Sequence, residues 1–173
     1  MNEPVQRLIK EAETAYQNKQ FMDACQCYEK AAETTLHKAQ AGKLLRIASG
    51  IYQEAGGINK AEECLQKAIL LLEGHQKAEC LLERWKKTIN TIVHFEYDCS
   101  FEWRGETDGS HDSYEDDLNQ YQKIAEGVLK QALSVKGVDR DRILEKAEDE
   151  CRKCEDQDGW GATRCWNSIS NTT

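Results

Sequence analysis

Residues 3–73 of this chain repeat themselves with a period of 37 residues. Residues of similar type recur at that spacing in both halves of the stretch, and the alanines coincide most clearly. The matching pairs are Leu8/Leu45, Phe21/Ile58, Ala24/Ala61, Cys27/Cys64, Tyr28/Leu65, Lys30/Lys67 and Ala31/Ala68. A fixed period of this length is typical of helical repeat proteins, in which each unit stacks on the next.

Within each unit the apolar residues follow the spacing of one helix face. A bulky residue is followed by Ala after three positions, by a large apolar residue after four more and by Ala again after three. The small alanines let a neighbouring helix approach closely. Amphipathic stretches at 5–18 and 39–55 precede these helices, so each unit is predicted to be an antiparallel helical hairpin. Gly56 is predicted as a left-handed helix cap, and Asn59 with Glu62 as a capping box.

These residues resemble the tetratricopeptide repeat, whose second helix has this spacing of alanines and bulky residues. The 37-residue period is similar to that of the longer-helix variety found in soluble NSF attachment proteins. The first unit has Lys19 where the family has glycine, and the second unit has Gly56 there. The resemblance implies a short right-handed superhelix of stacked hairpins and a role as a protein-binding adaptor in vesicle transport.

The rest of the chain also favours helices, because the single proline of the sequence, Pro4, lies before it. Helical periodicity continues beyond Gly74, and it returns in a C-terminal hairpin. The prediction is an all-α protein of about seven helices. Its parts are helical repeats at 1–95, an acidic loop or arm at 96–112, a helical hairpin at 113–156 and a flexible tail at 157–173.

Residues 93–103 allow two interpretations. Apolar and polar residues alternate strictly, which is typical of a strand, whereas Phe95, Cys99 and Trp103 share the spacing of a helix face. A lone strand would lack a partner in a helical protein. If the segment is extended, it forms a partner-binding arm with four aromatic side chains on one face: Phe95, Tyr97, Phe101 and Trp103.

The negative charge of the chain disfavours some classes of binding partner. The chain carries a formal net charge of −8, and residues 96–117 contain nine acidic residues and one basic residue, Arg104. This field repels nucleic acid and anionic lipid. No apolar run reaches the length of a membrane span, and the N-terminal residues do not form a secretory signal. We therefore expect a cytoplasmic protein without an integral membrane segment.

The helical-repeat interpretation also predicts where a protein or peptide ligand would bind. Stacked hairpins curve the first helices of the units into a concave groove. Members of the family that bind the carboxylate tail of chaperones have Lys and Asn at the groove positions, and this chain does not, so that ligand is disfavoured. The candidate groove residues are Gln6, Ile9, Glu13, Gln17, Arg46, Gly50 and Gln53.

The eight cysteines are predicted to be reduced, because several lie on the apolar faces of helices. Cys151 and Cys154, with Cys165 nearby and His111 as a conceivable fourth ligand, are weak candidates for zinc. Acidic neighbours of Cys151 and Cys154 favour the thiol over the thiolate, which argues against redox catalysis.

No motif places a nucleophile beside a base, and no phosphate-binding loop is present. The sequence therefore predicts a non-enzymatic adaptor or scaffold that needs no cofactor and presents a helical groove. Two alternatives remain at this point. One is a structural subunit that forms homodimers through the arm at 93–103, and the other is a small cysteine-based zinc or redox module.

Overall fold

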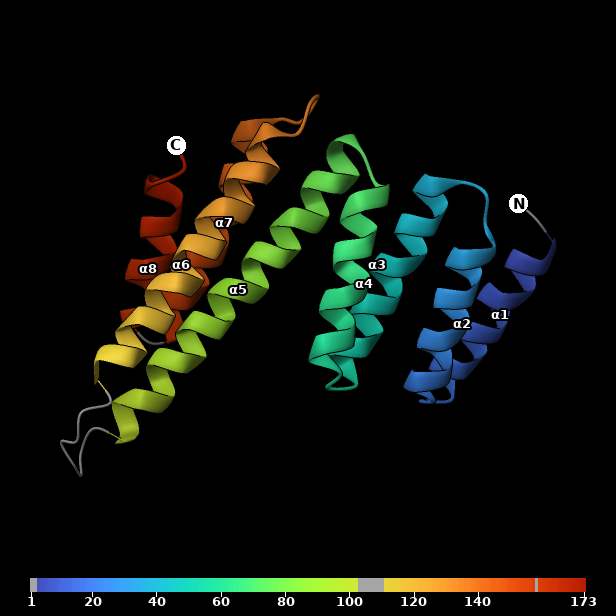
Figure 1. The fold of residues 1–173 in the computed structure, drawn as a ribbon, viewed down its shortest axis with the longest axis horizontal. Coiled ribbons are helices and arrows are strands. Elements are labelled where there is room, and N and C mark those ends of the chain that lie inside the picture. The colour runs from blue at the N-terminus through green and yellow to red at the C-terminus, as the bar shows by residue number, and fades with distance from the viewer. Residues whose placement is uncertain (1–2, 103–110, 158) are drawn as a thin grey trace. The chain divides into compact units, whose positions relative to one another are not determined.

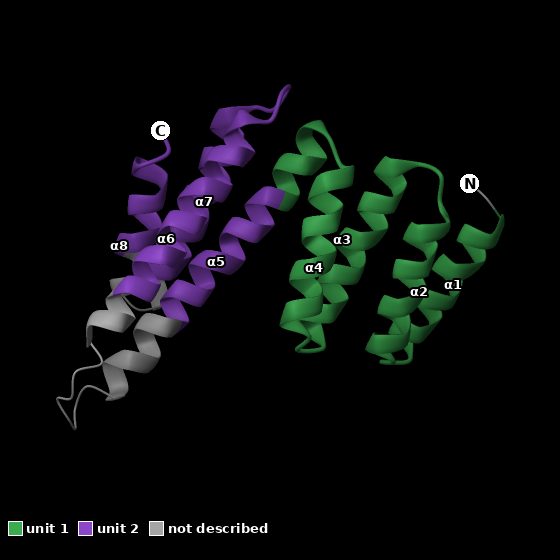
Figure 2. Cartoon of the chain, in the orientation of Figure 1, with its two compact units in different colours: residues 1–80 green, residues 81–173 purple. Residues whose placement is uncertain are grey.

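The chain folds into helices joined by short connections (Figure 1). The computed structural model describes residues 3–102, 111–157 and 159–173, and only the backbone at 95–102, 111–115, 156–157 and 159–162. These described residues form eight helices and contain no strand, which confirms the all-α prediction. Contacts divide the chain into unit 1, residues 1–80, and unit 2, residues 81–173 (Figure 2).

Unit 1 consists of two helical hairpins and the beginning of a fifth helix. The four hairpin helices pack in chain order, the first on the second, the second on the third and the third on the fourth, and short connections join them at alternating ends (Figure 1). The second helices of the hairpins begin and end 37 residues apart, so the repeat seen in the sequence is also a repeat of structure. The helices are α1 (Glu3–Gln17), α2 (Phe21–Thr34), α3 (Lys38–Glu54), α4 (Ile58–Leu71) and α5 (Gly74–Glu102).

The two hairpins turn in the same way. Lys19 has a φ of 60° and Gly56, 37 residues later, has a φ of 76°, so both turns contain a left-handed residue. In each turn the next residue donates its backbone N–H five residues back, to the carbonyl of Ala15 at 2.9 Å or of Tyr52 at 2.7 Å. Gly56 thus provides the predicted left-handed cap, and Lys19 adopts the same conformation with a side chain.

Lys19 gives a test of this equivalence, because a residue with a Cβ is disfavoured at positive φ. We expect Lys19→Gly to raise the free energy of unfolding by about 0.5–1 kcal/mol, the left-handed penalty reduced by the greater entropy of glycine in the unfolded chain. Gly56→Ala should lower it by about 1 kcal/mol. Urea unfolding followed by circular dichroism measures both changes, and equal effects of the two substitutions would contradict the shared turn geometry.

The alanines predicted to face a neighbouring helix are buried, with Ala24 0% and Ala61 2% exposed. Ile58 differs from its counterpart Phe21, which packs edge-on against Tyr16 with ring centroids 5.6 Å apart. The second hairpin lacks an aromatic residue at the position equivalent to Tyr16, and Ile58 is 73% exposed. The predicted capping box is wrong, because Asn59 lies inside α4, which begins at Ile58.

Unit 2 contains the remainder of α5, with α6 (His111–Ser134), α7 (Arg140–Gln157) and α8 (Gly159–Ser170). α8 packs against α6 and α7. Asp139 caps the N-terminus of α7, since its Oδ1 accepts a hydrogen bond from the backbone N–H of Arg142 at 3.3 Å. The fully buried side chains of unit 2 include Trp85, Ile89, Ile92, Ala125, Leu129, Ala132, Ile143, Ala147, Cys151 and Cys165.

The structure decides one alternative in the C-terminal half and corrects one prediction. Of the two interpretations of residues 93–103, the helix holds, because α5 continues through Glu102, and Trp103 lies outside the described residues. The flexible tail at 157–173 is wrong, because most of it forms α8. This helix buries Cys165, Ser168 and Ile169. Their burial supplies stabilisation that a composition rich in Gly, Ser and Thr did not indicate.

Candidate functional site

The predicted groove residues lie on the first helix of each hairpin. Most are exposed, while Ile9 and Arg46 are partly buried. Arg46 is not available as an isolated cation, because its guanidinium lies 3.6 Å from the carboxylate of Glu79 on α5. Binding of a ligand by this set stays a prediction. α1 carries Gln6, Ile9, Glu13 and Gln17, and α3 carries Arg46, Gly50 and Gln53.

A second surface of unit 1 forms a measurable groove. It has a volume of about 270 Å³ and lies between the second helices of the two hairpins, with α3 contributing one residue. We call it the α2–α4 groove. Its lining residues are Glu29, Ala32, Glu33, Leu45, Lys67, Leu70 and Leu71.

The walls of the α2–α4 groove carry charges of opposite sign. Glu29 and Glu33 are one helical turn apart on α2, and Lys67 comes from α4. Glu29 is held in place from α3, because the buried Tyr52 donates its hydroxyl to Glu29 Oε1 at 2.6 Å. Burial, followed by this hydrogen bond, raises the pKa of Tyr52 above its ordinary value, so the hydroxyl remains a donor at neutral pH.

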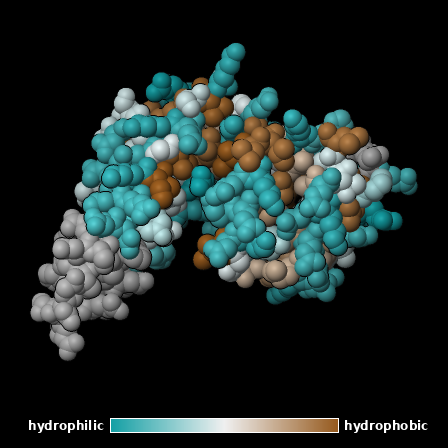
Figure 3. Space-filling view, in the orientation of Figure 1, coloured by the Kyte–Doolittle hydropathy of each residue, from teal (hydrophilic) through white to brown (hydrophobic). Residues whose placement is uncertain are grey.

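One large apolar side chain of the groove lining is exposed, and so is one that follows the α2 wall in sequence. Leu70, which lines it, is 81% exposed, and Leu36, three residues beyond Glu33, is 89% exposed. The space-filling view shows apolar surface over the C-terminal end of α4 (Figure 3). Single exposed leucines are common, but Leu70 lines a groove whose other walls include Leu45 and Leu71, which favours a contact surface.

One feature of the sequence, which the helical periodicity does not explain, indicates this groove. Residues 68–72 are continuously apolar, and a helix that packs by one face cannot bury every side chain in such a run. The structure buries Ala68 and Leu72 and leaves Leu70 exposed between them. The other residues of the groove come from three helices, so their proximity depends on packing.

The buried thiols of Cys25 and Cys64 in unit 1 are expected to be unreactive at neutral pH. Cys25 is 0% exposed, and its Sγ donates a hydrogen bond to the carbonyl of Ala48 at 3.6 Å. Burial raises the pKa of Cys25 to about 12 and that of Cys64 to about 11. At neutral pH both side chains are therefore neutral thiols, which are poor nucleophiles and poor metal ligands.

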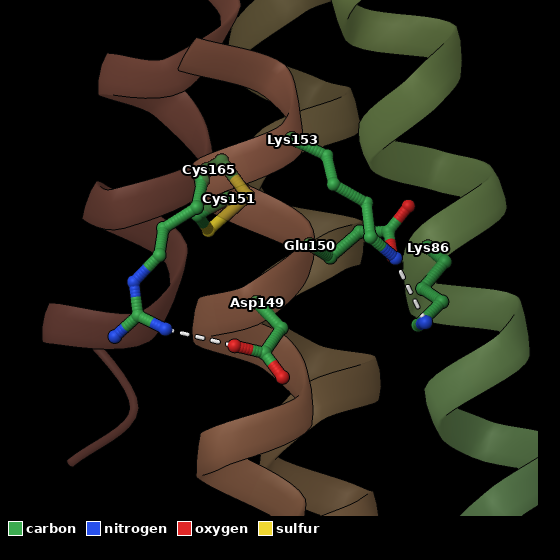
Figure 4. Close-up of polar contacts among 7 residues, drawn as sticks. Lys86, Asp149, Glu150, Cys151, Lys153 and Cys165 are labelled. Atoms are coloured by element: carbon green, nitrogen blue, oxygen red, sulfur yellow. Dashed lines mark hydrogen bonds and ion pairs between the residues drawn. A yellow bond between two sulfur atoms is a disulfide. The ribbon is translucent and has the colours of Figure 1, made fainter. Parts of the chain in front are cut away.

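The cysteines of unit 2 differ from the prediction. Cys151 on α7 and Cys165 on α8 form a disulfide, with Cα atoms 5.4 Å apart (Figure 4). The expectation of reduced thiols is wrong for this pair, because packing of α8 on α7 brings two buried sulfurs together. Cys154 is buried as a thiol, and burial raises its pKa. The disulfide removes two of the three thiolates from the zinc alternative and joins Cys151 to Cys165 rather than to Cys154.

Next to the disulfide, an ion-pair network connects α7 to α5 (Figure 4). Glu150 Oε2 lies 2.9 Å from Lys86 Nζ and 3.1 Å from Lys153 Nζ. Burial alone would raise the pKa of Glu150, but the hydrogen bonds from the two lysines outweigh it and lower the pKa below its ordinary value. The carboxylate form of Glu150 therefore stabilises unit 2.

This lowered pKa predicts how stability depends on pH. A group with a lower pKa in the folded state stabilises the fold above its ordinary pKa, near 4.5, and loses that contribution as the pH falls below it. We expect Glu150→Gln to reduce the free energy of unfolding by about 1–2 kcal/mol at pH 7. The difference from the wild type should shrink toward pH 3.

The measurement is urea unfolding followed by tryptophan fluorescence, since all four tryptophans lie after residue 80 and report on unit 2. Glu145→Gln is the matched control, because Glu145 is an exposed carboxylate on the same helix. If Glu150→Gln and Glu145→Gln had the same effect at both pH values, the Lys86–Glu150 network would not contribute.

The remaining candidates do not form a site. Phe95, Tyr97 and Phe101 lie on α5 without describable side chains, so an extended arm is not formed by residues 93–102. His75 Nε2 lies 3.4 Å from Glu79 Oε1 at the surface. Among the side chains that the structure describes, no three His, Cys, Asp or Glu residues gather as metal ligands would.

No described helix combines the length and apolar character needed to cross a membrane. Comparison of the chain with protein-family models, with curated protein sequences and with solved structures found no match.

Proposed function

We propose that this chain is a non-enzymatic adaptor whose unit 1 binds another protein through the α2–α4 groove. The observation that carries the proposal is the exposed Leu70, which lines a groove of about 270 Å³. Burying an exposed leucine of this kind is worth about 1.5–3 kcal/mol, so the surface gains stability when it is covered. This location replaces the α1 and α3 face as the preferred binding surface.

The low reactivity of these cysteines supports a binding role over a catalytic one. Cys25, Cys64 and Cys154 are buried thiols with raised pKa values, and Cys151 is held in a disulfide. Nucleophilic catalysis requires an accessible side chain with a base beside it. The groove itself is lined by carboxylates, one lysine and aliphatic side chains, which suit recognition.

The cellular process in which this adaptor would act is suggested by the resemblance to tetratricopeptide repeats of the soluble NSF attachment protein variety. That resemblance favours vesicle transport in the cytoplasm. The disulfide gives a test of this setting, because the cytosol keeps most thiols reduced. Cells are quenched rapidly and the chain is alkylated under denaturing conditions without reductant, so that the buried Cys151 and Cys165 are accessible. Alkylation of both supports the cytoplasmic assignment, and protection of both contradicts it.

The binding role is tested with two substitutions on one helix. Leu70→Asp places a charge in the α2–α4 groove, and Ile58→Asp does so at an exposed position of α4 outside the groove lining. Both variants are used as bait beside the wild type, and captured proteins are quantified by mass spectrometry. We expect Leu70→Asp to lose a partner that the wild type and Ile58→Asp retain.

Two results would contradict the proposed binding surface. One is a set of partners that is unchanged by Leu70→Asp. The other is equal loss with both variants, which would indicate a general effect on α4. Circular dichroism of the purified variants confirms that each keeps its helical content before the comparison is made.

A further inference from the structure

We infer that the α2–α4 groove takes a peptide segment in which apolar side chains stand next to basic ones. The inference rests on the proposed function and names the chemistry of the partner. It is carried by the size of the groove, by the exposed leucine in it and by the arrangement of charges on its two walls.

The size of the groove favours side chains of a peptide over a small organic ligand. Sites for cofactors and drug-sized molecules have volumes of about 300–1,000 Å³ and enclose most of the ligand. The α2–α4 groove, at about 270 Å³, lies near the lower end of that range, and it does not enclose a ligand, since Leu70 in its lining is 81% exposed. A groove of this size between two helices suits one or two aliphatic side chains of an amphipathic segment.

The charges on the walls set the sign of the partner. Glu29 and Glu33 place two carboxylates on the α2 wall, and Lys67 places one ammonium group on the α4 wall. Tyr52 fixes Glu29 through a hydrogen bond, so this carboxylate is oriented before binding. An occupant with a lysine or arginine beside its apolar residues would pair with the α2 wall. Lys67 would remain available to a carbonyl or carboxylate of the same segment.

The charge of unit 1 leaves the choice of partner to these local groups. Residues 1–80 contain 10 Lys and Arg and 11 Asp and Glu, a formal net charge of −1, and the larger negative charge belongs to residues 81–173. A basic segment would therefore be oriented by the carboxylates of α2 rather than attracted by the chain as a whole.

The test uses three labelled, amidated peptides and measures binding to the purified full chain by fluorescence anisotropy. LKKLLKKLLKKL combines the apolar and basic features, LEELLEELLEEL reverses the charge, and SKKSSKKSSKKS removes the apolar residues. We expect the first peptide to bind at least about 10-fold more tightly than either of the others.

Variants locate the binding on the chain. Leu70→Ser should weaken binding of LKKLLKKLLKKL about 10-fold and Glu33→Lys about fivefold. Asp23→Lys is the matched control, because it makes the same change in net charge at an exposed position of α2 outside the groove lining, and it should change the affinity less than about twofold.

The possible failures are distinguishable. Equal weakening by Glu33→Lys and Asp23→Lys overturns the inference, because it shows attraction by net charge alone. Equal binding of the acidic and basic leucine peptides, sensitive to Leu70→Ser, overturns the basic partner and leaves the proposed binding surface intact. If none of the peptides binds at about 100 µM, the partner chemistry is wrong, and the capture experiment with Leu70→Asp still decides the proposed function.

Discussion

Trp85→Ala is expected to lower the free energy of unfolding of unit 2 by about 3–5 kcal/mol. Trp85 is fully buried, and its Nε1–H donates a hydrogen bond to Ser168 Oγ at 3.1 Å. Ser168 is itself fully buried and donates its hydroxyl to the carbonyl of Cys165 at 2.9 Å. The substitution therefore leaves both a cavity and a buried hydroxyl that has lost its donor.

Trp85→Phe separates the two contributions. Phenylalanine keeps most of the apolar volume and loses the N–H, so we expect a smaller decrease of about 1–2 kcal/mol. Urea unfolding followed by circular dichroism suits both variants, because each loses one of the fluorescent reporters. If Trp85→Ala changed the stability by less than about 1 kcal/mol, the site would not be the packed centre of unit 2.

Loss of the Cys151–Cys165 disulfide should lower the free energy of unfolding by about 3 kcal/mol. The bond joins residues 14 apart in sequence, and closing a loop of this length in the unfolded chain accounts for an effect of this size. We expect the double variant Cys151→Ala, Cys165→Ala to unfold at lower urea concentration than the wild type. Tryptophan fluorescence should report the change, because all the tryptophans follow residue 80.

A reductant provides the control for this experiment. Dithiothreitol should destabilise the wild type by a similar amount and leave the double variant unchanged. Cys154→Ala tests the assignment of the pair, because Cys154 is close in sequence and buried but is not in the bond. If reductant had the same effect on the double variant as on the wild type, the stabilising bond would not join Cys151 to Cys165.

The hairpins of unit 1 could be predicted because their signals are local. The helix face defined by Ala24, Tyr28 and Ala31 recurs 37 residues later, and both copies lie in helices of equal length. Lys19 shows the limit of such signals. Its type gives no hint of a left-handed conformation, which follows from the turn that the neighbouring helices require.

Prediction was incomplete where local signals conflict and wrong where burial depends on distant residues. Strict alternation at 93–103 fits a strand and the same residues fit a helix, so the sequence left both open. A helix satisfies its backbone hydrogen bonds without a partner strand. α8 has a composition typical of a tail, yet Cys165 and Ser168 bind groups on α7 and α5. Those partners are far away in sequence, so no short window reveals them.

The α2–α4 groove could be predicted only in part. The apolar run at 68–72 indicated that a large side chain would be left at the surface. Its neighbours Glu29 and Leu45 come from other helices, and the hydrogen bond from Tyr52 to Glu29 spans 23 residues. The sequence alone therefore does not show which charged residues line the groove, because helix packing brings them together.

The matched turns at Lys19 and Gly56 make the unit 1 hairpins interchangeable in register. Consider a copy of residues 21–57 inserted after Gly57. The order of helices would become α1, α2, α3, a copy of α2, a copy of α3, and α4. Each neighbouring pair would then match a pair that already packs in the chain, because the copy of α2 takes the place that α4 has after α3. Each junction would reuse a backbone geometry that the chain already adopts. The length of this part of the molecule would then depend on the number of copies inserted.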